Sequence, residues 1–375
     1  MNPAGFFADY DAFGDRRTGG EGDAAAAAWL RDKTAATGAE ARLLPAPFTR
    51  LTPGRATLEG ASFAFEGLPL FDGGLTGPDG IVGHLGPLGS DAPIGIAEMD
   101  PAAASLPGNA FARARAESRH AGIVIALRTK PDGLAPLNAH DLAAPFGPPV
   151  LQLAGRDAPR LMALTEAGAQ ARLVATGTRA PGLSQSIRAE LAGMAPPLVL
   201  LTPRTSWWTS TAERGGGILA WLAALKALAQ APRARGVVAL ATCGHELGHI
   251  GAHQAFAAEP ELAAQARLVV HLGANLGAAE DARLTVRSNV PGVAERMAAR
   301  LEAAGYPAEA LEVVTGGKAN GEAHEVEARG GRYLSLIGKN PWFHAPEDRW
   351  PVSVDCARAS AIAGAVAALS VEAAR

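Results

Sequence analysis

The stretch GVVALATCGHELGHI, residues 236–250, passes from a run of apolar and small residues directly into a loop of histidine, glutamate and glycine. An unbroken apolar run of this length is typical of a strand that is buried on both faces of a sheet. In sheets of parallel strands joined by helices, the loops at the carboxyl ends of the strands carry the groups that bind ligands. The stretch therefore predicts a parallel-strand fold, with a site in the loop that follows residue 242.

The same alternation continues on both sides of this stretch. Further apolar strand-like runs lie at 198–202, 267–272 and 333–338, and helical patterns lie at 217–231, 260–266 and 293–304. Strands that alternate with helices predict crossover connections and helices on both faces of the sheet. We expect a three-layer α/β/α sandwich with a mostly parallel central sheet.

The chain changes character before residue 184. Residues 45–183 are rich in glycine and proline and hold short apolar runs such as 122–127 and 149–153, which predicts a smaller, β-rich inserted domain. An alanine-rich helix is expected at 21–37, ahead of the insertion. The larger domain would then consist of residues 1–44 and 184–375.

Composition narrows the class of protein. The sequence is 48% hydrophobic and 19% charged, with a net charge of −3 that does not favour nucleic acid or an anionic membrane as a partner. Two cysteines do not form a disulfide framework. The first residues lack the basic start and apolar run of a secretory signal, and no uninterrupted apolar run reaches the roughly 20 residues of a membrane span. We expect a cytoplasmic globular protein.

Several segments resemble the M28 family of zinc aminopeptidases. CGHELGHIGA (243–252) is similar to the loop in which that family carries two adjacent glutamates, and FHAPED (343–348) resembles its closing histidine loop. GDRRTGG (14–20) and SQSIRAELAG (184–193) look like earlier family segments, and AESRHAGIVI (116–125) resembles part of a protease-associated (PA) domain. The resemblance spans nearly the whole chain and implies an M28 peptidase-like domain with an inserted PA-like domain.

At the family's functional positions the sequence departs from this pattern. The resemblance implies that Glu246 and His344 keep two of the five metal positions and that His245 replaces the catalytic glutamate. Because two donors cannot hold two zinc ions, we predict that the paired-zinc site is lost and expect no cofactor. The other three metal positions fall on Pro203, Arg214 and Gly273, with Asn275 close enough to Gly273 to shift that register, and Thr205 stands at the aspartate of the first loop.

We therefore predict a diverged, metal-poor or metal-free hydrolase-like enzyme that acts on a small amide- or carboxylate-bearing substrate. Its catalytic groups would be His245, Glu246 and His344, and its partner a small-molecule or peptide-like anionic ligand. Arginine binds carboxylates through a fork of donors, which makes Arg214 and Arg204 candidate anchors. Other candidate substrate-binding residues are Thr205, Trp207, Glu322 and His324.

Three alternatives stay open. One is an inactive pseudopeptidase that serves binding or assembly. At the site, a structural ion pair of Arg214 with Glu246 is an equal alternative to the anchor role of Arg214, and a homo-oligomer is a further expected partner. His245-Glu-Leu-Gly-His249 also matches the zincin pattern His-Glu-x-x-His, although its glycines disfavour the helix that this pattern needs. A single zinc would then be bound by Glu246, His344, and His245 or His249. An ordinary aminopeptidase requires a different register at several loops.

Overall fold

The computed structural model describes residues 2–104, 108–129, 132–140 and 144–375. The contacts between residues divide the chain into two compact units. Unit 1 is made of Met1–Ala46, Leu183–Phe343 and Glu347–Arg375, and unit 2 is made of Pro47–Gly182 and His344–Pro346.

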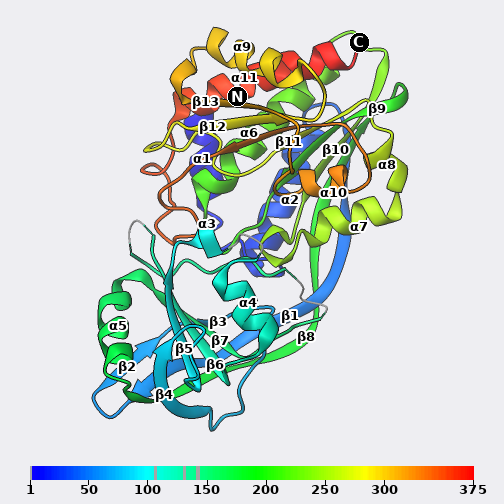
Figure 1. Ribbon diagram of the computed structural model, residues 1–375. Helices are drawn as coiled ribbons and strands as arrows, with labels where there is room; N and C mark the ends of the chain where they lie inside the picture. The colour runs from blue at the N-terminus through cyan, green and yellow to red at the C-terminus, as the bar shows by residue number, and fades with distance from the viewer. Residues whose placement is uncertain (1, 105–107, 130–131, 141–143) are drawn as a thin grey trace. The chain divides into compact units, whose positions relative to one another are not determined.

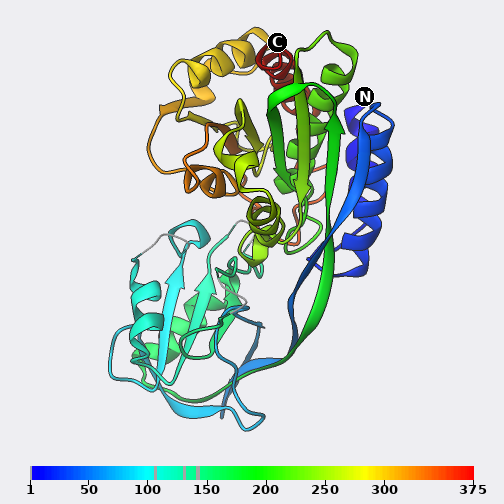
Figure 2. The same cartoon turned by 90° about the vertical axis from the view of Figure 1, so that its right-hand side faces the viewer.

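Unit 1 is built on a mixed sheet with the strand order β13-β12-β14-β11-β9-β10-β8 (Figures 1 and 2). Its centre is parallel, because β10 pairs with β9, β9 with β11, and β11 with β14 in that sense. The flanking pairs β8–β10 and β12–β14 are antiparallel. The strands are β8 (Gln170–Leu191), β9 (Met194–Pro203), β10 (Arg235–Thr242), β11 (Leu268–Leu272), β12 (Leu284–Ser288), β13 (Leu311–Thr315) and β14 (Tyr333–Gly338).

Alternate residues of the central strands face two separate layers of helices. Leu198 and Leu200 of β9 join the core that packs against α6, α9 and α11, whereas Val199 and Leu201 join the core beneath α7, α8 and α10. This alternation follows from the strand repeat of two residues, and it explains why the strands read as continuous apolar runs. The helices are α6 (Thr211–Gln230), α7 (Ile250–Ala258), α8 (Pro260–Ala264), α9 (Val293–Ala303), α10 (Ala323–Glu327) and α11 (Cys356–Ala373).

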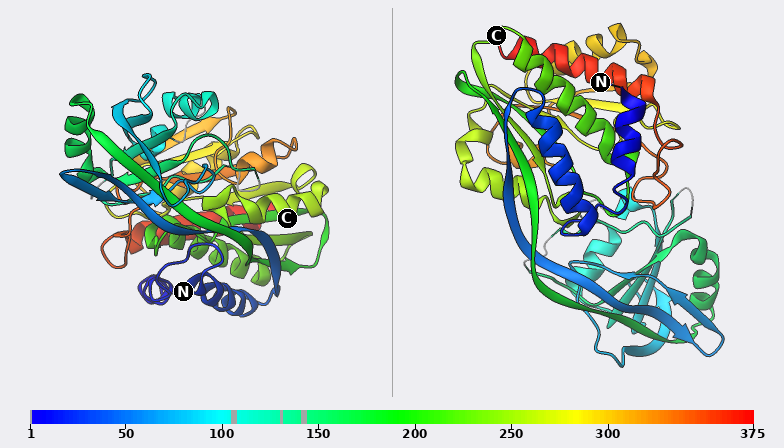
Figure 3. Two further views of the ribbon diagram at one scale, coloured as in Figure 1. Left: turned by 90° about the horizontal axis from the view of Figure 1, so that it is seen from below. Right: turned by 180° about the vertical axis from the view of Figure 1, so that it is seen from behind.

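The N-terminal segment supplies two more helices on the α6 side of the sheet. Helices α1 (Pro3–Asp11) and α2 (Glu21–Ala35) pack on α6, as the view from behind in Figure 3 shows. Phe6 stacks on Tyr10 and lies against Trp29, which ties α1 to α2. The loop between these helices carries Thr18, a residue of the site described below.

Helix α6 begins at Thr211, six positions before the helix that the sequence predicts at 217–231. Three consecutive glycines weaken a helix by propensity, but here close packing requires them: a Cβ on Gly216 would lie 1.5 Å from the carbonyl oxygen of Leu276. The buried Asp348 carboxylate accepts hydrogen bonds from the N–H groups of Ala212 and Glu213 in the first turn. Tertiary packing therefore extends the helix across residues that sequence reasoning placed in a loop.

Unit 2 contains a smaller sheet in which β4, β5, β6 and β7 lie side by side and parallel, with β3 antiparallel to β7. Helix α5 packs against β4 and β5, and the apolar side chains of β5, β6 and β7 form its cores. Strands β1 (Glu40–Gly60) and β8 run through both units. The other elements of unit 2 are β2 (Phe63–Glu66), β3 (Leu68–Pro69), β4 (Ile81–Pro87), β5 (Ile94–Met99), α3 (Pro101–Ala104), α4 (Ala110–Glu117), β6 (Gly122–Leu127), β7 (Val150–Ala154) and α5 (Ala158–Glu166).

The predicted α/β fold with a large, mostly parallel sheet is confirmed. Strands β6 and β14 have the bounds that the sequence predicts, whereas β12 and β13 were not predicted. By length and composition alone α11 qualifies as a membrane span, with a mean hydropathy of 1.3, and 39% of it is buried in the protein. Ile362, Val366 and Leu369 on this helix belong to the core of unit 1.

Candidate functional site

The segment after β10 turns sharply and does not continue as a helix. Gly244 and Gly248 have left-handed φ values of 73° and 85°, and the non-glycine residue His249 has φ 58°. A short 3-10 turn, His245–Leu247, lies between them, and α7 begins at Ile250. As a result, the rings of His245 and His249 come together, with their centroids 4.9 Å apart. The His-Glu-x-x-His pattern is present, but it is not on one helix.

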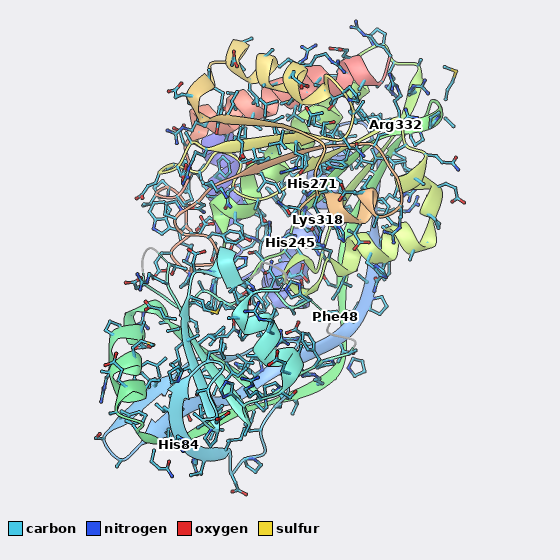
Figure 4. The ribbon with its side chains drawn as sticks, viewed as in Figure 1. Phe48, His84, His245, His271, Lys318 and Arg332 are labelled. Atoms are coloured by element: carbon cyan, nitrogen blue, oxygen red, sulfur yellow. The ribbon has the colours of Figure 1, made fainter. Side chains whose placement is uncertain are left out.

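A buried chain of polar side chains leads from this turn into the sheet. Nδ1 of His245 lies 2.7 Å from Oε1 of Glu322, a residue just ahead of α10. The other carboxylate oxygen of Glu322 lies 3.2 Å from Nε2 of His271, which is on β11. Nδ1 of His271 is in turn 2.8 Å from the hydroxyl of Ser335 on β14. His245 and His271 are labelled in Figure 4.

The surroundings fix the charges of this chain. Burial lowers the pKa of His245 to about 4, helped by the positive charge of Arg214 and opposed by Glu322. Burial also lowers the pKa of His249. Burial acting alone would raise the pKa of Glu322, but His245 and His249 hold it well below its usual value. At neutral pH an ionised carboxylate therefore lies among imidazoles that are neutral at His245 and His249.

Glu246 points into a different environment. Its carboxylate accepts a hydrogen bond from the N–H of Thr18 at 2.7 Å and from the hydroxyl of Thr205 at 2.8 Å. Glu246 is completely buried, and burial raises its pKa although Thr18 and Thr205 oppose the change. Thr205 is itself held by the N–H of Gly244, which donates to its hydroxyl at 2.8 Å. Thr205 therefore contacts protein groups at the position that sequence reasoning assigned to the substrate.

The two predicted arginine anchors are bound by the protein. Arg214 pairs with the adjacent Glu213 at 2.7 Å and donates through Nε to the carbonyl oxygen of Thr205, and both Arg214 and Glu213 are buried. The alternative ion pair between Arg214 and Glu246 is wrong, because Glu213 is the partner. Arg204 pairs with Asp23 at 2.6 Å, with side chains that are 2% exposed on each side. Both guanidinium charges are thus compensated inside unit 1.

The remaining predicted residues are dispersed. Trp207 is 1% exposed and therefore buried within the protein. His324 has a side chain that is 48% exposed and lies 4.0 Å from Glu327, so it does not join the chain of His245 and Glu322. His344 belongs by its contacts to unit 2, where its Nδ1 lies 2.7 Å from the carbonyl oxygen of Pro136. Of the predicted pocket residues, Glu322 is the one that contacts His245.

A hollow lies on the sheet beside Ser335, the last residue in the row of polar side chains that begins at His245. It has a volume of about 200 Å³, and Ser335, which contacts His271, is one of its lining residues. Arg287 is directly opposite Ser335 in the β12–β14 pair. The lining residues are Thr285, Arg287, Glu312, Asn320, Ser335, Ile337 and Lys339. The cavity thus carries two cationic side chains and one carboxylate, and Thr285 donates to that carboxylate at 2.7 Å.

Among the residues that the structure describes, His245, His249 and Glu322 form a group whose ligand atoms all lie within 4.8 Å of one another. Imidazole nitrogen and carboxylate oxygen are both donors that zinc accepts. This group does not include Glu246 or His344, the two residues that the resemblance places at metal positions.

Comparison with solved structures identifies the fold. A zinc aminopeptidase from Bacillus subtilis superimposes with a TM-score of 0.78 at 18% sequence identity, covering 100% of this chain and 95% of that one. The fold is that of the M28 zinc aminopeptidases. A peptidase M28 precursor from Shewanella amazonensis (TM-score 0.74, 17% identity, 100% and 92% covered) and an aminopeptidase from Aneurinibacillus (TM-score 0.74, 15% identity, 100% and 93% covered) are similar as well. No protein-family model matches the sequence, and no curated protein matches it.

Three residues of this candidate site were missed by sequence reasoning. His271 lies in the apolar run 267–272, where one histidine among valines and leucines is the signal that was available. Ser335 in the run 333–338 is a similar interruption. Glu213, the partner of Arg214, is adjacent to it in sequence. It was not predicted because the residues before 217 were expected to form a loop.

Proposed function

We propose that this chain is a peptidase-like hydrolase that acts on a small amide- or carboxylate-bearing substrate without the paired zinc ions of the aminopeptidases whose fold it shares. The observation that carries the proposal is the buried contact of 2.7 Å between Nδ1 of His245 and Oε1 of Glu322. It lies in the loop after β10, at the edge of the sheet where folds of this type perform chemistry. Burial of such groups costs free energy unless they are paired or used, so a retained cluster favours a working site.

The residues at the family's metal positions do not fit a pair of zinc ions. Pro203 and Arg214 carry no group that donates a lone pair to a metal, and Arg214 adds a fixed positive charge. Glu246 keeps a carboxylate, but Thr18 and Thr205 both donate to it. The reactive centre is therefore displaced from the family's zinc positions to His245 and Glu322.

Glu322 orients the His245 ring, and His271 orients Glu322. An ionised carboxylate that accepts from Nδ1 keeps the proton on that nitrogen and leaves Nε2 as the basic atom of the ring. A carboxylate held between two histidines is also restrained in its rotamer, which lowers the entropy lost when a substrate binds. Nε2 of His245 would take a proton from the water as its oxygen attacks the amide carbonyl carbon. The C–N bond would then break, the amine would leave with that proton, and the acyl part would leave as a carboxylic acid.

The substrate class follows from the cavity beside Ser335. Arg204 and Arg214 are compensated by Asp23 and Glu213, whereas Arg287 and Lys339 line the hollow together with Ser335, which contacts His271. A volume of about 200 Å³ is suited to an amino acid or a short acyl group rather than a folded protein. We therefore place the carboxylate of the substrate against Arg287 and Lys339.

The test is a hydrolysis assay on the full chain with N-acyl amino acids, amino-acid amides and dipeptides. His245→Ala and Glu322→Gln should each reduce turnover by about 100-fold or more while circular dichroism stays unchanged. His253→Ala is the matched control, because this histidine of α7 has a side chain that is 62% exposed. Equal activity in all four proteins would contradict the role of His245 and Glu322.

A second candidate function is binding without catalysis, as in a pseudopeptidase. It is favoured because Glu246, Arg214 and Arg204 already form hydrogen bonds or ion pairs with Thr205, Glu213 and Asp23. In that case the wild-type protein hydrolyses none of the substrates, yet small carboxylates still raise its thermal stability. Two equivalents of zinc together with rapid peptide cleavage would rule out both functions.

A further inference from the structure

We propose that His245, His249 and Glu322 bind a single divalent transition-metal ion. This inference deepens the proposed function, on which it rests for the use of the ion but not for the binding itself. In protein that holds the ion, His245 is a ligand and no longer acts as the base. The site differs from the family's metal positions, because it takes two histidines and a glutamate that do not belong to that set.

The donor set is the first argument. Two imidazoles and one carboxylate match a ligand set that zinc uses in catalytic sites, where a fourth position stays open for water. Tetrahedral zinc with bonds of about 2.1 Å separates its ligand atoms by about 3.4 Å. The ligand atoms of His245, His249 and Glu322 lie within 4.8 Å of one another, which is at most about 1.4 Å beyond that spacing. Imidazole donors also favour zinc, cobalt or nickel over calcium and magnesium.

The backbone supports the same conclusion. In a continuous helix His245 and His249 would be one turn apart on one face, but here the left-handed residues Gly244, Gly248 and His249 fold the segment back on itself. A non-glycine residue in that conformation costs about 1–2 kcal/mol. His249 adopts it, and the result is that its ring approaches His245 to 4.9 Å between centroids.

The residues around the group form an outer layer of the kind found at metal sites. His271 contacts the second oxygen of Glu322 at 3.2 Å, and Ser335 contacts the far nitrogen of His271 at 2.8 Å. His271 and Ser335 are both buried in the sheet. Such partners fix the orientation of a ligating carboxylate and typically contribute about 10–100-fold to metal affinity.

The charges also suit one cation rather than two. Glu322 supplies one carboxylate, and His245 and His249 each supply one imidazole nitrogen, so the group offers three donors to a single ion. The guanidinium charge of Arg214 acts on His245 and disfavours a second cation close by. Glu213 pairs with Arg214 at 2.7 Å and compensates much of that charge, so the repulsion of a single ion by Arg214 is reduced.

The experiment measures metal binding directly, apart from activity. Full-length protein without a histidine tag is stripped with a chelator and titrated with zinc by calorimetry and with cobalt by visible absorption. We expect one equivalent, with the absorption bands of tetrahedral cobalt. His249→Ala and Glu322→Gln should weaken binding by about 100-fold or more, and Ser335→Ala by about 10-fold. His253→Ala, the exposed histidine of the same segment, should bind like the wild type.

Three results would overturn the inference: no binding at micromolar metal, one equivalent that His249→Ala and Glu322→Gln leave unchanged, or two equivalents that Glu246→Gln removes. Hydrolysis distinguishes this failure from that of the proposed function. Activity that persists in excess chelator, with no metal bound, rejects the metal site and keeps the hydrolase. One bound equivalent with no hydrolysis of any substrate keeps the metal site and rejects the hydrolase.

Discussion

Glu246 accepts a hydrogen bond of 2.7 Å from the backbone N–H of Thr18, a residue 228 positions earlier in the chain. The Glu246 carboxylate is thus connected to the loop between α1 and α2, and it also accepts a hydrogen bond from the hydroxyl of Thr205 after β9. We therefore expect Glu246 to hold this loop against the segment after β9.

The first prediction concerns that contribution. Glu246→Ala should lower the free energy of unfolding by about 2–4 kcal/mol, because the N–H of Thr18 and the hydroxyl of Thr205 would lose their buried acceptor. Glu246→Gln keeps one acceptor oxygen and should cost about half as much. Urea unfolding followed by fluorescence measures both, with the exposed Glu261→Ala as the control. Equal free energies of unfolding for Glu246→Ala and the wild type would show that the hydrogen bonds from Thr18 and Thr205 do not stabilise the protein.

A second prediction follows from the buried pair of Arg214 and Glu213. Removing either charge leaves the other buried and uncompensated, which typically costs about 3–5 kcal/mol. Arg214→Met and Glu213→Gln should therefore each be strongly destabilising, and the double variant should be less so than the sum of the two. A double-mutant cycle in urea measures the coupling, expected at about 1–3 kcal/mol. If the two changes in the free energy of unfolding were simply additive, Glu213 would not stabilise Arg214, and Arg214 would again be a candidate anchor for a ligand.

Asp348 gives a third prediction, on pH. Burial raises its pKa to about 6 from 3.8, although the N–H groups of Ala212 and Glu213 partly oppose the change. Because the folded-state pKa is the higher one, the contribution of Asp348 to stability is fully present below pH 3.8 and is lost as the pH rises through about 6.

Asp348→Asn removes that titration. The stability of the wild type relative to this variant should be about 1 kcal/mol greater at pH 5 than at pH 8, from a full effect of about 3 kcal/mol for a shift of this size. Chemical denaturation of both proteins at several pH values gives the difference directly. A difference that is independent of pH would mean that Asp348 is ionised throughout, held by its two N–H donors.

The sequence predicted the layers of the fold because those depend on local patterns. Strand β14 was predicted with its observed bounds, since an apolar run flanked by glycine and polar residues needs no further information. The start of α6 was not predicted, because Gly215, Gly216 and Gly217 are disfavoured in a helix unless a neighbouring backbone lies against them. For Gly216 that neighbour is Leu276, and no local pattern reveals it.

The site was predicted less fully than the fold for the same physical reason. The loop of His245 was identified from the strand that leads into it, but its contact with Glu322 joins residues 77 positions apart. The contact of His271 with Ser335 depends on β11 lying beside β14, an order that is set by the crossover connections. Arg204 and Arg214 looked available to a ligand because a sequence does not show that Asp23 and Glu213 point at them.

The last prediction tests the cavity lined by Arg287 and Lys339. If a substrate carboxylate binds there, Arg287→Ala and Lys339→Ala should each raise KM for N-acyl amino acids by about 10–100-fold, since a hydrogen bond to a charged group contributes about 1.5–3 kcal/mol. The kcat values should change much less, because these side chains hold a part of the substrate that does not react. Amino-acid amides, which lack the carboxylate, should show no such rise.

Arg283→Ala is the control, as its side chain is 71% exposed and pairs with Asp281. A rise in KM of equal size for amides and acids would mean that the cavity is not where the carboxylate binds, because loss of a charge partner must discriminate between the two substrates.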